Sequence, residues 1–247
     1  MFYAQPGDLT SMQQALFYRI LCKLHKNRWY FNQSGHKQNS MRSHTKETQD
    51  GLTPELALDI LKEGNERFVN NIKAHRNLLE QVNETSSGQF PFAAILSCID
   101  SRTSAELIFD QGLGDVFSIR IAGNILNDDI LGSMEFACKV AGSKLIVVLG
   151  HTKCGAIEGA CSDIHFGYLT GLISKIKPAI EMETSIMENR NAENTAFVNK
   201  VTENNVFITV QKIKEQSSIL NDMDKTGEIK IVGGLYDLDT GKVRFYE

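Results

Sequence analysis

The sequence predicts an α/β fold, with a mainly parallel central β-sheet flanked by helices and a helical extension at the N-terminus. Short apolar segments of strand length alternate with segments of helical periodicity, which indicates a layered α/β domain. The segment 145–149 is apolar throughout, as in a central strand that helices cover on both faces. No internal repeat or low-complexity tract interrupts residues 51–247, so we expect one domain there.

Residues 1–50 are predicted to be an extension outside the folded domain, which spans 51–247. The first forty residues carry five Lys or Arg against one acid, and 12–26 has the spacing of a short amphipathic helix. The polar stretch 32–50 is typical of disorder. Three interpretations stay open: a targeting presequence, an extra docking helix, or a segment absent from a mature protein that starts at Met41.

The folded domain is predicted to begin with a helix over 54–71, because Thr53 can cap it and Pro54 suits its first position. Later boundaries come from changes of periodicity and from turn residues. The elements that follow are, in chain order, a polar connector over 81–89, a strand over 92–97, a helix over 104–110, a strand over 116–121, a helix over 128–141, a strand over 145–149, a helix over 169–183, one or two helices over 193–218, and two strands over 229–236 and 242–246.

Composition and charge argue against several classes of protein. The formal net charge is −4, whereas nucleic-acid-binding proteins usually carry a strong basic excess. No apolar run approaches the ~18 residues of a membrane span. The 5 cysteines, an odd number in a chain of this length, favour a reducing compartment such as the cytoplasm. Organellar targeting by the first forty residues stays open.

Two chemically loaded segments directly follow predicted strands. One begins with Cys98, and the other holds His151 and Cys154. In open α/β sheets, ligands gather outside the carboxyl ends of the strands, where neighbouring strand ends meet. Thiolate and imidazole are preferred zinc ligands, and three protein ligands with an open fourth position are typical of catalytic zinc. Asp100 is the only nearby candidate for a fourth ligand.

The two segments read Cys98-Ile99-Asp100-Ser101-Arg102 and His151-Thr152-Lys153-Cys154-Gly155. In this order and spacing they resemble the motifs of the β-class carbonic anhydrases, and the likeness extends over residues 52–247. The resemblance implies a β-carbonic anhydrase-like fold and the reversible hydration of carbon dioxide to bicarbonate and a proton, by way of a zinc-bound hydroxide. It also implies a homodimer or homotetramer with the pocket near a subunit interface.

The resemblance further assigns roles to residues. Cys98, His151 and Cys154 would hold one Zn²⁺ per subunit, and Asp100 and Arg102 would form a catalytic pair beside it.

The same resemblance implies four substrate-binding positions. Gln89 would hold a substrate oxygen through its amide, and Phe117, Ala122 and Phe136 would line a small apolar pocket. Phe136 stands where the family has Tyr, so this chain supplies no hydroxyl at that position.

Elementary chemistry explains why such a site needs the Asp–Arg pair. Zinc lowers the pKa of bound water from 15.7 toward about 7, but two thiolates weaken it as a Lewis acid. Asp100 can accept a hydrogen bond from the bound hydroxide and so aim its lone pair, while Arg102 holds the carboxylate ionised through a fork that Lys cannot reproduce. A released Asp100 could instead close the fourth zinc position. Members of the family with that closed site have Trp where this chain has Ile95, so we expect an open site.

Two other functions stay open from the sequence. A hydrolase for carbon disulfide or carbonyl sulfide would use the same zinc site with a different access channel. A non-catalytic zinc-binding protein, or a thiol redox protein with Cys98 and Cys154 as a disulfide pair, would leave Asp100 and Arg102 dispensable.

Overall fold

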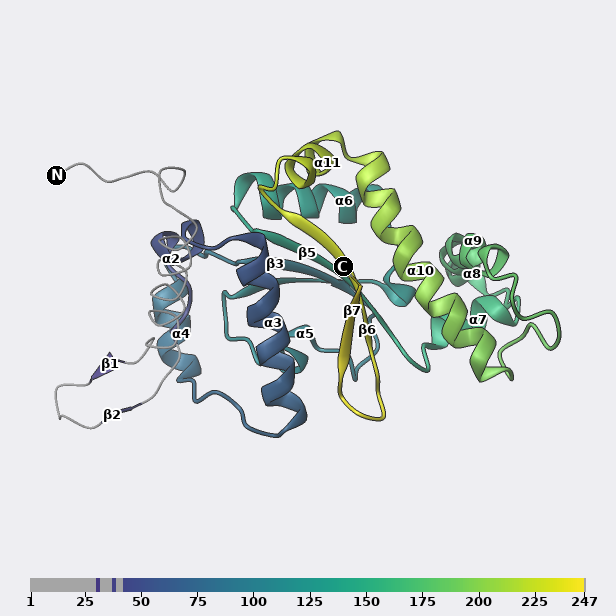
Figure 1. The fold of residues 1–247 in the computed structure, drawn as a ribbon, viewed down its shortest axis with the longest axis horizontal. Helices are drawn as coiled ribbons and strands as arrows, with labels where there is room; N and C mark the ends of the chain where they lie inside the picture. The colour runs from purple at the N-terminus through teal and green to yellow at the C-terminus, as the bar shows by residue number, and fades with distance from the viewer. Residues whose placement is uncertain (1–29, 32–36, 39–41, 247) are drawn as a thin grey trace, which may run out of the picture. The chain divides into compact units, whose positions relative to one another are not determined.

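The computed structural model describes residues 30–31, 37–38 and 42–246, and the chain divides into two compact units (Figure 1). The first unit takes Met1–Arg42 with Ala74–Asn77, and within it β1 (Tyr30–Phe31) pairs antiparallel with β2 (Lys37–Gln38). The predicted helix over 12–26 lies outside the described residues. The second unit, Ser43–Lys73 with Leu78–Glu247, holds the predicted α/β domain.

A five-stranded sheet runs through the second unit in the order β4-β3-β5-β6-β7. Its strands are β3 (Ala93–Ser97), β4 (Val116–Arg120), β5 (Leu145–His151), β6 (Lys230–Tyr236) and β7 (Val243–Tyr246). The first four are parallel and β7 is antiparallel to β6, which confirms the mainly parallel sheet. β5 is central and buried along its whole length, as its unbroken apolar run predicted.

Helices cover both faces of the sheet (Figure 1). One face packs against α3 (Pro54–Val69) and α5 (Ala105–Ile108). The elements on the other face are α6 (Asp128–Glu135), the π-helix η3 (Phe136–Val140), α10 (Thr195–Gln216) and α11 (Ser218–Lys225). Beyond the carboxyl ends of the strands, a third apolar cluster packs α7 (Gly155–Cys161) and α9 (Lys177–Met182) against α10.

Local signals account for most helix boundaries. The Thr53 hydroxyl accepts a hydrogen bond from the Leu56 amide and Pro54 opens α3, as predicted. The predicted helix over 169–183 is broken into α8 (Gly167–Ile173), the 3-10 turn η4 (Ser174–Ile176) and α9. Pro178 has no N–H to continue the helical bonding, which explains the break.

One boundary lies outside the predicted ranges. Ser217 ends α10, and its hydroxyl accepts from the Leu220 amide to begin α11, so the helical region continues to Lys225.

Two segments predicted to lack structure are helical. The polar connector over 81–89 is partly occupied by α4 (Leu78–Thr85), whose Gln81 is buried and accepts a hydrogen bond from the Leu113 amide. Residues 43–50, placed in a disordered stretch by their polarity, include α2 (Lys46–Asp50). Gln49 of α2 is fully buried, so polarity here reflects hydrogen bonding within the fold rather than exposure to solvent.

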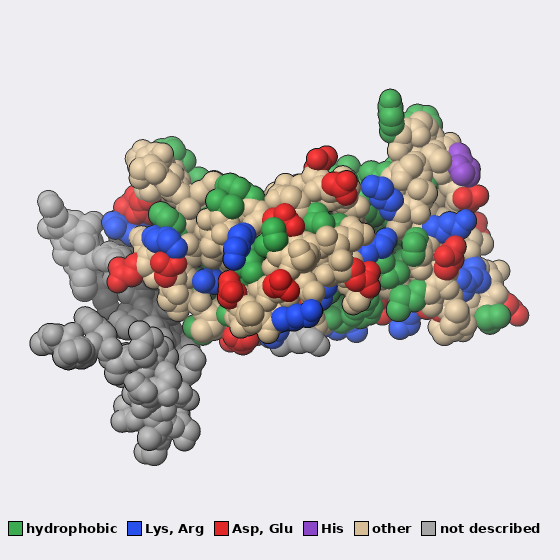
Figure 2. Space-filling model, turned by 90° about the horizontal axis from the view of Figure 1, so that it is seen from above, with side chains coloured by type: hydrophobic (Ala, Val, Ile, Leu, Met, Phe, Trp, Pro, Cys, Tyr) green, Lys and Arg blue, Asp and Glu red, His purple; other side chains and the backbone are tan. Residues whose placement is uncertain are grey.

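The surface of the second unit mixes charges of both signs. On the face shown in Figure 2, acidic and basic side chains of the described residues alternate with small apolar patches. No helix in the described part of the chain is long and apolar enough to cross a membrane.

Candidate active site

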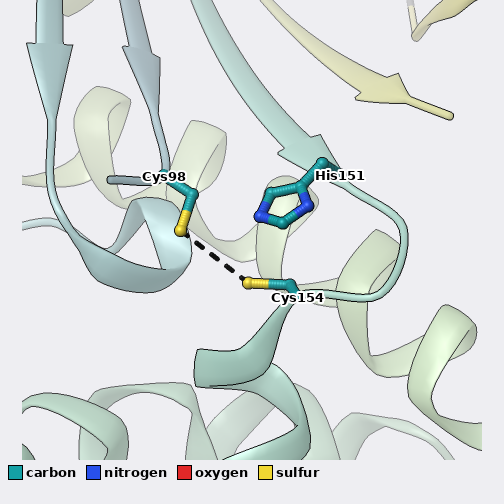
Figure 3. Close-up of side chains that lie close together, drawn as sticks. All are labelled: Cys98, His151 and Cys154. Atoms are coloured by element: carbon teal, nitrogen blue, oxygen red, sulfur yellow. Dashed lines mark hydrogen bonds between the residues drawn. The ribbon is translucent and has the colours of Figure 1, made fainter. Parts of the chain in front are cut away.

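Three predicted metal ligands converge at the carboxyl ends of two neighbouring strands. Cys98 directly follows β3, His151 is the last residue of β5, and Cys154 caps the start of α7. Since β3 and β5 are parallel neighbours, their ends lie side by side. The sulfur atoms of the two cysteines are 3.9 Å apart, and the ligand atoms of all three residues lie within 4.8 Å of one another (Figure 3).

The His151 ring is oriented for metal binding. Its Nδ1 lies 2.9 Å from the Thr152 carbonyl oxygen, which can only accept, so Nδ1 carries the proton and donates. The opposite nitrogen, Nε2, therefore has a free lone pair. It is buried and has no hydrogen-bond partner among the residues that the structure describes. A buried imidazole nitrogen facing two thiols fits zinc, which this soft sulfur and nitrogen set prefers.

The pKa values of the two cysteine thiols are shifted in opposite directions. A hydrogen bond from Cys154 lowers the pKa of the Cys98 thiol to about 4, while that bond and burial raise the pKa of Cys154. The amide of Gly123 also donates to the Cys98 sulfur, at 3.4 Å. Both bonds to the Cys98 sulfur favour its thiolate, and the thiolate is the form that binds metals.

Asp100 is held by a two-bond fork from Arg102. Arg102 Nε donates to Asp100 Oδ1 at 2.9 Å and Nη2 donates to Oδ2 at 2.7 Å, while the Arg102 backbone amide donates to Oδ1 at 2.9 Å. These bonds hold the pKa of Asp100 well below its usual range. The carboxylate is therefore ionised and oriented, with both oxygens engaged by Arg102.

Arg120 and Thr103 fix the backbone that carries this pair. Arg120 donates to the carbonyl oxygens of Cys98 at 3.1 Å and Asp100 at 2.6 Å, and the Thr103 hydroxyl donates to the same two oxygens. Sequence analysis did not identify either role. The strand register could have found Arg120, since it pairs with Ser97, the residue before Cys98.

The segment from His151 to Cys154 is fixed by the connection between β6 and β7, a second feature that sequence analysis missed. The Thr152 amide donates to the Tyr236 carbonyl at 3.0 Å, and its hydroxyl accepts from the Leu238 amide at 3.0 Å. Lys153, whose φ of 54° is in the left-handed region, forms an ion pair with Asp239. No local motif signals these contacts, because they join positions more than 80 residues apart.

The four predicted substrate-binding residues are not gathered at this site within one chain. Ala122 adjoins it, because the Gly123 amide that follows it contacts Cys98. Gln89 precedes the amino end of β3, so the length of that strand, about 16 Å, separates it from Cys98. Phe117 pairs with Ala94, also toward the amino end.

Phe117 and Phe136 do meet each other. Their rings contact edge to face, with centroids 6.2 Å apart. They line a groove of about 820 Å³ on the outer side of β4, an edge strand of the described sheet. Phe136 is half exposed in this groove.

Comparison with known proteins identifies the family. The family model described as carbonic anhydrase matches residues 93–243. Carbonic anhydrase 2 of Mycobacterium tuberculosis is 38% identical over 191 residues, covering 76% of this chain and 91% of its own length.

Solved structures agree on the fold. A β-carbonic anhydrase of Aspergillus fumigatus covers 78% of this chain and 90% of its own, with a TM-score of 0.58 at 24% identity. One of two tetrameric β-carbonic anhydrases of Sordaria macrospora covers 77% and 94%, with a TM-score of 0.59 at 21% identity. Family model, relatives and fold agree with the Cys98, His151 and Cys154 group, and the chain belongs to the β-carbonic anhydrases, a family of enzymes whose activity it shares.

Proposed function

We propose that the chain catalyses the reversible hydration of carbon dioxide to bicarbonate and a proton, with one Zn²⁺ per chain held by Cys98, His151 and Cys154. The observation that carries this proposal is the buried convergence of the three ligands, with the lone pair of His151 Nε2 unpartnered among the described residues. The forked Asp100–Arg102 pair beside them supports a catalytic role over a structural one, because a structural zinc site needs no such pair.

The chain's own residues prepare the nucleophile. Zinc, when bound, supplies a water acidified to near neutral pH. Asp100 would accept a hydrogen bond from that nucleophile and so aim it. Arg102 fixes the orientation of the carboxylate and lowers the pKa of Asp100 below its usual range. We favour the open form of the site, because both Asp100 oxygens are engaged by Arg102 rather than turned toward the ligands.

We further propose that a second copy of the chain completes the substrate pocket. Gln89 and Phe117 lie toward the amino ends of β3 and β4, away from the ligands of their own chain, and Phe136 contacts Phe117. The groove that holds the two phenylalanines lies along β4, whose outer edge is unpaired within the described sheet. An edge strand beside an apolar groove is suited to association with another chain. The solved relatives from Sordaria macrospora are tetramers.

We also propose a reducing compartment such as the cytoplasm. The sulfur atoms of Cys98 and Cys154 are only 3.9 Å apart, and the site needs both as thiolates rather than as a disulfide.

Stopped-flow hydration of carbon dioxide, combined with metal analysis, tests the catalytic proposal. In Asp100→Asn we expect zinc to be retained and hydration to fall by about 100-fold, within the range known for residues that orient metal ligands and bound groups. Asp163→Asn changes an exposed aspartate on another loop and should have wild-type activity. Full activity in Asp100→Asn, or a chain that holds no stoichiometric zinc, would contradict the proposal.

Sedimentation analysis tests the second copy. Phe136→Asp places a charge in the groove and is expected to dissociate the assembly and lower hydration together. Val140→Asp is the matched control, since Val140 is exposed on the same π-helix but does not line the groove. A monomeric wild type with full activity would refute the shared pocket.

A further inference from the structure

A buried asparagine on α10 is connected to a metal ligand through one glycine. Asn205 Nδ2 donates to the Gly123 carbonyl oxygen at 2.8 Å, and the Gly123 amide donates to Cys98 Sγ at 3.4 Å. Both bonds are buried, and Asn205 is only 3% exposed. The carbonyl can only accept, so the amide nitrogen of Asn205 must face it. Three elements distant in sequence, α10, η2 (Ala122–Asn124) and the end of β3, are thereby joined.

Gly123 needs external support to aim its amide at the sulfur. Its backbone is in the left-handed region, with φ 67° and ψ 18°. A Cβ there would lie 2.9 Å from Ile176 Cδ1 and 3.2 Å from Ala156 Cβ, so only glycine fits both the conformation and the space. Glycine has the most backbone freedom of any residue, and the bond from Asn205 restricts it by holding the adjoining carbonyl.

The amide bond to sulfur has a chemical consequence for the metal. An N–H donor withdraws charge from a thiolate, so Cys98 binds as a weaker electron donor and leaves the metal a stronger Lewis acid. The effect matters at this site because two thiolate ligands by themselves lower the Lewis acidity of the metal. We propose that Asn205 is a positioning residue that sets the donor strength of Cys98 through Gly123. The inference rests on the proposed zinc site.

Space filling does not explain Asn205. It borders a pocket of about 500 Å³, together with Thr209 one turn further along α10. Asn205 and Thr209 are both only 3% exposed, and an apolar side chain would fill such a buried position without a bond to the Gly123 carbonyl. The amide of Asn205 is better explained by the role of Gly123, because the Gly123 carbonyl accepts its hydrogen bond and the Gly123 amide donates to Cys98.

Cobalt-substituted protein tests the proposal without relying on activity. The variants are Asn205→Leu, which keeps the branched shape of the side chain and removes the donor, and Asn205→Ala. Thr209→Val is the control, because it makes an isosteric polar-to-apolar change in the same pocket. The readouts are the thiolate-to-cobalt charge-transfer band and zinc retention against a chelator.

We expect both Asn205 variants to shift the band to longer wavelength and to change zinc affinity by about tenfold, the lower limit for residues that orient metal ligands. Thr209→Val should leave both readouts unchanged. Wild-type spectra and affinity in Asn205→Leu would overturn the proposal. So would failure of both Asn205 variants to fold while Thr209→Val folds, because Asn205 would then serve the core. A wild type that binds no metal would instead refute the proposed function.

Discussion

Replacing Gln49 with methionine is expected to destabilise the fold by about 2 kcal/mol while leaving the metal site intact. Gln49 Nε2 donates to the carbonyl oxygens of Pro91 and Ala141, both at 2.8 Å. These carbonyls lie just before β3 and β5, so α2 joins the amino ends of the two strands whose carboxyl ends carry Cys98 and His151. Methionine has a similar length to glutamine but cannot donate.

The magnitude follows from which carbonyl loses its partner. The Pro91 oxygen also accepts from the Ser143 hydroxyl at 2.9 Å, so losing one of its two bonds costs about 0.5–1 kcal/mol. The Ala141 oxygen loses the bond that Gln49 supplies, at about 1–3 kcal/mol. Gln49 Oε1 is itself buried without a partner among the described residues, so removing this oxygen offsets a fraction of the destabilisation. The balance is about 2 kcal/mol, which lowers Tm by about 4–8 °C in a domain of this size.

Thermal and urea unfolding of Gln49→Met measure this cost. Gln211→Met provides the control, because Gln211 is exposed on α10 and bonds only Glu215 in the described structure. Its Tm should lie within about 1 °C of wild type. Zinc content should be normal in both variants, since β3 separates Gln49 from the ligands. An unchanged Tm in Gln49→Met would show that residues 43–50 are not part of the cooperative fold.

Three further outcomes are expected. Because Arg102 lowers the pKa of Asp100, the carboxylate's contribution to stability is present above its ordinary pKa and is lost as pH falls through the lowered one; Arg102→Lys should therefore lower Tm at neutral pH, and the difference from wild type should shrink as pH falls. Gly150→Ala places a Cβ 2.6 Å from Val206 Cγ2 and should cost about 1–3 kcal/mol in urea unfolding, partly recovered by adding Val206→Ala. Cys138→Ala should keep its full zinc content in metal analysis, because burial raises the pKa of that thiol to about 12 and it lies in the core behind β5.

The sequence predicted the elements whose signals are local. A few consecutive residues are enough to predict the strand β5, from its apolar run, and the start of α3, from Thr53-Pro54. The α2 and α4 helices were missed because their buried residues, Gln49 and Gln81, are polar. A buried glutamine is stabilised by carbonyl and amide partners 32 to 92 positions away, and no window of sequence contains those partners.

In the candidate site, too, the residues with local sequence signals could be predicted and those that depend on distant contacts could not. The ligand pattern could be predicted, since Cys98 and His151 each stand at the end of an apolar strand and parallel strands align their ends. The residues that hold the ligands could not. Arg120 comes from β4 and Asn205 from α10, and Thr152 is held by Leu238 of the β6–β7 connection, so each contact depends on tertiary packing.

The polarity of the sheet also supports the proposal that a second copy of the chain completes the substrate pocket. Parallel strands place every carboxyl end at one edge, and the ligands are there with Asp100 and Arg102. Gln89 and Phe117 lie toward the opposite ends of the same strands, and no side chain spans the intervening distance of about 13–16 Å. A second chain antiparallel to the first across β4 would bring its amino-end residues to these ligands, because a two-fold axis reverses strand direction. On this argument the apolar groove beside β4 is needed for catalysis as well as for assembly, so substitutions there should lower hydration without removing zinc.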